Sequence, residues 1–187
     1  MKQRIPMWLA VAALPLAALA QPSPYAGQEA RAIKSLSDAE VKDLLSGQGM
    51  GLAKAAELNG YPGPAHVLEH AQALGLSPHQ RHATEALMQR HKERARQLGR
   101  ELVDAERRLD EAFARRTIDA GALAALTADI GARQARLRQE HLHTHLEQTA
   151  LLDEAQVRRY NELRGYTGAA QTHQGGHGQH PHGGSHR

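Results

Sequence analysis

Residues 77–114 decide the fold, since they read SPHQRHATEALMQRHKERARQLGRELVDAERRLDEAFA and predict one long helix. Ser77 and Gln80 form a capping box, and Pro78 suits the first helical position. After Pro78 the stretch holds no proline and one glycine, Gly99. Its apolar side chains recur at intervals of threes and fours, the period of a helix with one apolar stripe; they are Ala83, Leu87, Leu98, Leu102, Leu109 and Phe113. At about 1.5 Å per residue, this helix would be about 57 Å long.

A second long helix is predicted from Asp119 to about Ala150. Its apolar positions are Leu123, Leu126, Ile130, Leu137 and Leu142. Residues 115–118 form only a short connection between the two helices. The two helices should therefore fold back on each other as an antiparallel hairpin.

Short helices are expected on both sides of the hairpin. They are predicted after the capping box Ser37–Glu40, at 52–58, at 65–74 and from Asp153 to about Arg164. The fold class is thus all-α, a long antiparallel helical hairpin with short flanking helices. Two helices alone cannot cover both apolar stripes, so we expect a homodimer or packing of the N-terminal helices onto the hairpin.

Composition narrows the function. The chain has 187 residues, with 23 Lys and Arg against 20 Asp and Glu, a balance that argues against a nucleic-acid partner. It has no cysteine, which excludes disulfides, thiolate metal sites and a thiol nucleophile. The 13 histidines are the unusual feature, because imidazole is the commonest metal ligand.

The two ends of the chain differ from the middle. Residues 1–20 have a positive start, an apolar run and the small-x-small site Ala18-Leu19-Ala20, which predict a signal peptide and a periplasmic protein; an uncleaved anchor is the alternative. Residues 21–35 are expected to be a linker and residues 36–166 a helical domain. Residues 167–187 are rich in Gly, Gln and His and are predicted to be disordered.

Histidine spacing points to a metal site in the helical domain. His141 and His145 are four residues apart on one predicted helix, as are His66 and His70, so each pair shares a face. With a turn near residue 117, His91 should lie opposite residue 143 and close to the His141/His145 pair. Carboxylates that could complete the site are Glu57, Glu69 and Glu140. Such nitrogen and oxygen ligands suit divalent zinc, nickel, cobalt or copper.

The tail is a second candidate for metal binding. Its histidines are His173, His177, His180, His182 and His186. A His-rich tract is typical of metal capture, and the alternative is a polar tail without ligand function. A flexible tail should bind more weakly and less selectively than a site on helices, because it loses more conformational freedom on binding.

One catalytic pattern is present. His66-Val67-Leu68-Glu69-His70 fits the H-x-x-E-H motif of inverted zinc proteases, in which two His hold zinc and the Glu activates water. Here the motif lies on a short predicted helix, and no sheet is predicted to shape a cleft. We therefore interpret the chain as a binding protein and not as an enzyme.

The helix starts resemble those of a known family. The capping boxes with Leu76, Ser77 and Gln80 and with Leu152, Asp153 and Gln156 are similar to the paired Leu-Thr-x-x-Gln motifs of the Spy/CpxP periplasmic chaperones. Residues 56–69 and 141–166 resemble the subgroup of periplasmic heavy-metal sensors, so the likeness covers about 36–166. Ser77 and Asp153 replace the family's Thr, but both residue types cap helices.

The resemblance implies a function. Members of this family are all-helical, usually dimeric and independent of ATP. They bind unfolded polypeptides on a concave face, sense envelope stress, or bind zinc, nickel, cobalt or copper, and they are not catalysts. We therefore expect a periplasmic metal sensor or buffer with chaperone activity, whose partners are a second copy, unfolded polypeptides and a membrane-bound regulator. The alternative is a polypeptide-holding chaperone whose histidines are incidental.

Overall fold

The computed structural model describes residues 23–166, and every regular element in this part of the chain is a helix. The helices are α1 (Asp38–Ser46), α2 (Lys54–Glu57), α3 (Pro64–Glu69), α4 (Pro78–Ala114), α5 (Ala120–Ala150) and α6 (Glu154–Leu163). The predicted all-α class is confirmed. The expected signal peptide and His-rich tail lie outside the described residues.

The described residues fall into two units, which divide between Ala30 and Arg31. In the described part of the first unit, the Ala26 N–H donates to the Ser23 carbonyl at 3.0 Å and closes a turn.

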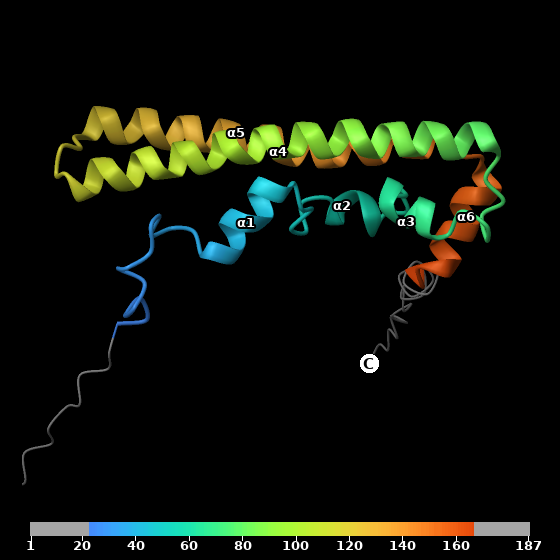
Figure 1. The fold of residues 1–187 in the computed structure, drawn as a ribbon, viewed down its shortest axis with the longest axis horizontal. Coiled ribbons are helices and arrows are strands. Elements are labelled where there is room, and N and C mark those ends of the chain that lie inside the picture. Colours follow the sequence, from blue (N-terminus) through green and yellow to red (C-terminus); the bar gives the residue numbers. More distant parts are fainter. Residues whose placement is uncertain (1–22, 167–187) are drawn as a thin grey trace, which may run out of the picture. The chain divides into compact units, whose positions relative to one another are not determined.

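The predicted hairpin is the main feature of the second unit. Helices α4 and α5 run side by side in opposite directions and pack along their length (Figure 1). Leu98, Leu102 and Val103 of α4 join Ile130 and Leu137 of α5 in one buried cluster. The apolar spacing of residues 77–114 therefore predicted the buried positions Leu87, Leu98 and Leu102 correctly, whereas Phe113 at the end of the predicted stripe is exposed.

Helix α1 crosses α4 at the one glycine inside that helix. A Cβ added at Gly99 would lie 2.0 Å from the carbonyl oxygen of Leu44, so only glycine allows this approach. Leu44 is buried there, and Ile33 lies in the same cluster. Ile33 belongs to the segment we expected to be a linker, so the packed body includes the end of residues 21–35.

The two capping boxes of α4 and α6 are joined to each other. Ser77 and Asp153 cap their helices as predicted, each accepting from the backbone N–H of the glutamine three residues on. The Gln80 amide donates to the Gln156 Oε1 at 2.8 Å, and the Gln156 amide donates back at 3.1 Å. The motif thus fixes the start of α6 against the start of α4.

The short helices α2 and α3 lie along the hairpin. Both contact α5, and α3 also contacts α4 (Figure 1). The helix that we predicted at 65–74 ends at Glu69, because the hydrogen bonds tighten into turns from His70 to Gly75. Val67 and Leu74 from this segment bury against Tyr160 of α6 and form a second cluster.

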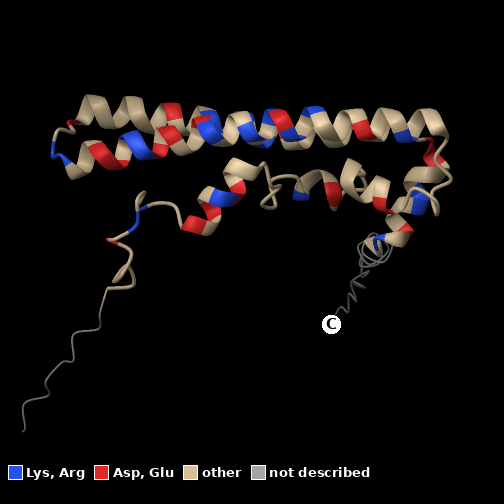
Figure 2. Cartoon of the chain, in the orientation of Figure 1, with Lys and Arg blue, Asp and Glu red and all other residues tan. Residues whose placement is uncertain are grey.

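Charged side chains cover the hairpin in both signs (Figure 2). Several of them pair between the two long helices, such as Arg108 with Asp129 at 2.7 Å and Arg133 with Glu101 at 3.2 Å. The exposed pairs, such as Arg108 with Asp129, each contribute little to stability. Among residues 23–166, no helix has the length and apolar character needed to cross a membrane.

Candidate metal centre

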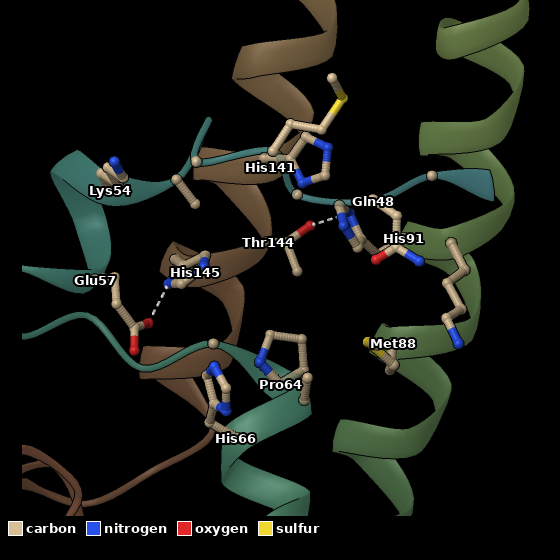
Figure 3. Close-up of a pocket in the computed structure, with 18 of the residues that line it drawn as sticks. Gln48, Lys54, Glu57, Pro64, His66, Met88, His91, His141, Thr144 and His145 are labelled. Carbon is tan, nitrogen blue, oxygen red and sulfur yellow. Dashed lines mark hydrogen bonds and ion pairs between the residues drawn. The ribbon is translucent and has the colours of Figure 1, made fainter. Parts of the chain in front are cut away.

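A cavity of about 410 Å³ lies where α2, α3 and the loop at 47–51 face the hairpin. Met88 and His91 reach it from α4, whereas His141, Thr144 and His145 reach it from α5 (Figure 3). Glu57 and His66 line it from the α2–α3 side. The cavity therefore brings together five of the eight metal ligands that we predicted in the helical domain, and His70, Glu69 and Glu140 do not line it.

Hydrogen bonds determine which ring nitrogen of His91 carries the proton. Its Nδ1 lies 2.9 Å from the Thr144 hydroxyl oxygen and 3.2 Å from Glu140 Oε1. The Thr144 hydroxyl donates to the Glu140 carbonyl, so it accepts from His91, and a carboxylate only accepts. Nδ1 of His91 thus carries the proton, and in the neutral ring Nε2 keeps a lone pair for a metal ion.

His145 is held in the same way. Its Nδ1 donates to the carbonyl oxygen of Tyr61 at 2.8 Å, with Glu57 Oε2 at 3.6 Å. Gly63 makes room for the ring, because a Cβ at that position would lie 2.7 Å from His145 Cε1. In the neutral ring Nε2 therefore keeps a lone pair that can bind a metal ion. Metal-binding histidines typically have a backbone carbonyl hydrogen-bonded to the other ring nitrogen in this way.

His141 is the most buried of the three, with 4% of the residue exposed. Its ring meets that of His91 edge to face at a centroid distance of 4.7 Å, as the hairpin register predicted. Burial, with smaller contributions from His91 and His145, lowers the pKa of His141 to about 4. Its Nε2 has no hydrogen-bond partner among residues 23–166. The neutral ring therefore keeps a buried nitrogen atom without a partner.

Glu57 has partners that we did not predict. Its Oε1 accepts from the hydroxyls of Tyr160 at 2.7 Å and Tyr166 at 3.1 Å, and from Arg164 Nε at 3.3 Å. Burial and this carboxylate raise the pKa of Tyr160, which keeps its hydroxyl protonated as a donor. Glu57 therefore ties α2 to the end of the described chain, and only Oε2 faces His145.

The H-x-x-E-H motif does not converge on the cavity. His66 lines it, but its Nδ1 pairs with Glu69 Oε2 at 3.1 Å on the exposed side of α3. His70 follows the last residue of α3 and does not line the cavity. The five tail histidines, from His173 to His186, lie outside the described residues.

Sequence reasoning missed several cavity residues. They include Gln48, Met50, Lys54, Met88, Lys92 and Thr144. The sequence did carry a signal for two of them, because Met50 and Met88 are the only methionines after residue 20.

Comparison with known proteins gives the family. Residues 47–159 match the model of the heavy-metal resistance family, and this match covers more than half of the chain. The chain belongs to the heavy-metal resistance family. No curated protein and no solved structure matched the chain. The part of the chain that matches the family model, residues 47–159, contains every residue that lines the cavity except Ser46.

The cavity residues fit a metal ion in their chemistry. Four imidazoles line one space. Those of His91 and His145 are fixed with Nε2 free, and that of His141 has its Nε2 buried and unsatisfied. The fourth, His66, pairs with Glu69 through its Nδ1. Within residues 23–166, however, no three His, Asp or Glu side chains already stand at metal-binding spacing. A bound ion would therefore need either a turn of these side chains or a ligand of another type.

Proposed function

We propose that the protein binds transition-metal ions in this cavity, with the imidazoles of His91, His141 and His145 as donors. The observation that carries the proposal is the unsatisfied, buried Nε2 of His141 beside two rings whose other nitrogens are fixed by hydrogen bonds. Such fixed partners orient ligands and lower the entropic cost of binding. Membership of the heavy-metal resistance family supports the same function.

We further propose that this binding serves metal resistance or stress sensing in the periplasm, without catalysis. The leader-like residues 1–20 support export, and the histidines of residues 167–187 add capacity for divalent ions. In this proposal the helical cavity sets selectivity and the tail sets capacity. A membrane-bound regulator would be the partner if the protein acts as a sensor.

Titration calorimetry with Zn²⁺, Ni²⁺, Co²⁺ and Cu²⁺ tests the proposal. The full-length chain should lose its tightest binding step when His141→Gln and His145→Gln are combined. His79→Gln with His82→Gln is the matched control, because both residues lie on the exposed start of α4 and neither lines the cavity. Equal loss in both variants, or no loss in the first, would refute the helical site.

Chaperone activity is the second candidate. Phe113 and Leu123 are large apolar residues that stay exposed near the turn of the hairpin, where α4 ends and α5 begins. Exposed apolar surface of this kind suits either an unfolded client or a second copy of the chain. Suppression of the aggregation of an unfolded client without ATP, weakened by Phe113→Ser with Leu123→Ser, would support it.

We also propose that the protein is a homodimer. The same exposed apolar residues support this proposal, because a second copy would cover them. Light scattering on the full-length chain should give twice the monomer mass. A monomer at all concentrations would remove the dimer and leave the exposed residues to clients.

A further inference from the structure

The cavity brings sulfur next to its histidines. Met50 and Met88 are the only methionines after residue 20, and both line this one cavity. A thioether is a soft ligand, which monovalent copper prefers and hard cations do not. Because the chain has no cysteine, these two residues are its only sulfur atoms beyond the predicted leader.

Met88 is placed to act together with His91. The two residues are three apart on α4, so their side chains lie on the same face of the helix. Figure 3 shows both extending from α4 into the space that His145 and Thr144 enter from α5. One helix therefore offers a thioether and an imidazole to the same volume.

Met50 comes from the loop that borders the cavity. This loop reads Gly-Gln-Gly-Met-Gly at 47–51, and Met50 has a φ of 46°, in the left-handed region that favours glycine. A non-glycine residue is rare in this conformation, and such backbone strain often marks a functional position. The loop thus holds a methionine at the edge of the cavity where its backbone alone would favour glycine.

The charge around the cavity favours an ion of low charge. Lys54 and Lys92 line it, and among residues 23–166 Glu57 is the one carboxylate that does. Glu140 lies outside the lining, on the Nδ1 side of His91 at 3.2 Å. Arg164 and two tyrosines already bind Oε1 of Glu57. Because repulsion by the two ammonium groups grows with the charge of the ion, a monovalent cation meets less of it than a divalent one.

The number of ready donors favours the same ion. His91 and His141 are in contact, but among residues 23–166 no third His, Asp or Glu joins a pair at metal-binding spacing. A soft monovalent ion accepts a lower coordination number than zinc or nickel. We propose that the cavity is a mixed imidazole–thioether site for cuprous ion, held by His91, His141 and Met88, with Met50 as a further sulfur ligand. This inference rests on the proposed metal-binding function.

The test uses the full-length chain with one equivalent of Cu⁺, supplied as such without oxygen, and Ag⁺ as an analogue that needs no reductant. X-ray absorption should show sulfur bound to copper in the natural chain. Met50→Leu with Met88→Leu keeps similar side-chain volumes and removes the thioethers. It should abolish the sulfur signal and weaken Cu⁺ and Ag⁺ binding by about tenfold or more, since loss of even an orienting neighbour costs roughly 10–100-fold.

The Zn²⁺ affinity of the same variants distinguishes failure of the thioether site from failure of the metal-binding cavity as a whole. The two leucine substitutions should leave Zn²⁺ affinity within about twofold, whereas His141→Gln should weaken both ions. Zinc binding that responds to His141→Gln, with no copper–sulfur signal or with unchanged Cu⁺ affinity in the leucine variant, overturns the thioether site alone. An equal loss of Zn²⁺ and Cu⁺ in the leucine variant also overturns it, since that marks a packing effect. If neither ion responds to His141→Gln, the cavity is not a metal site and both proposals fail.

Discussion

Gly99 tests how α1 is held on the hairpin. Replacing it with alanine should improve the intrinsic stability of α4 by about 1 kcal/mol, because glycine is a poor residue inside a helix. The new Cβ would, however, lie 2.0 Å from the Leu44 carbonyl oxygen and 2.7 Å from its carbon. Backbone cannot swing aside as a side chain can, so α1 must move by about 1 Å or more.

The two effects have opposite signs, and the steric one should win. Overpacking costs about 1–3 kcal/mol, and a clash with backbone belongs at the upper end. The net effect of Gly99→Ala is then a loss of about 2 kcal/mol in the free energy of unfolding. Gly131, inside α5, is the matched control: a Cβ there meets nothing within 4 Å, so Gly131→Ala should gain about 1 kcal/mol.

Thermal unfolding followed by circular dichroism measures the difference. A gap of about 3 kcal/mol between the two variants corresponds to roughly 9 °C in Tm for a domain of this size. Both variants need the same protein concentration, because a dimer would make Tm depend on it. If Gly99→Ala were as stable as Gly131→Ala, the close approach of α1 to α4 would be refuted.

Three further experiments probe the site and the helix starts. Gly63→Ala should weaken metal binding by about tenfold in calorimetry, because its Cβ would displace the His145 ring; unchanged affinity would contradict the role of Tyr61 in orienting that ring. Lowering the pH from 6.5 toward 4 should cost up to about 3 kcal/mol of stability, because unfolded His141 binds a proton that the buried ring does not. In urea unfolding, the free energy of unfolding should fall more steeply with falling pH for the natural chain than for His141→Gln. An equal fall in both proteins would exclude the effect. Gln80→Glu combined with Gln156→Glu should destabilise the protein by about 2 kcal/mol more than the sum of the two single changes. The reason is that two carboxylates, which repel each other, would replace two amides that donate to each other. Additive losses in the free energy of unfolding in urea would contradict this pairing.

The sequence predicted the parts of the fold that depend on local pattern. Capping boxes fixed where α4 and α6 begin, and the apolar period with a short connection gave the hairpin. Hairpin register then brought His91 to His141, since the pairing of antiparallel helices follows from the position of the turn. Periodicity is a short-range signal, and for these long elements it was sufficient.

The walls of the cavity were beyond that reasoning. Glu57 binds Tyr160 and Tyr166, which are more than 100 residues away along the chain. Nothing in the spacing of α2, a helix of four residues, shows which way it packs. For the same reason Glu57 was predicted as a metal ligand, although its Oε1 is already satisfied by other residues.

Irregular backbone explains why His145 is oriented as it is. Pro62 and Pro64 have no N–H, so the turn around Gly63 cannot form a regular hydrogen-bonded pattern. The Tyr61 carbonyl just before this turn still needs a donor, and the His145 Nδ1–H supplies it at 2.8 Å. This bond fixes the tautomer, and the tautomer leaves Nε2 as the metal-binding nitrogen. The Pro-Gly-Pro segment, which the sequence presents only as a helix breaker, therefore determines which atom of an α5 histidine can bind an ion.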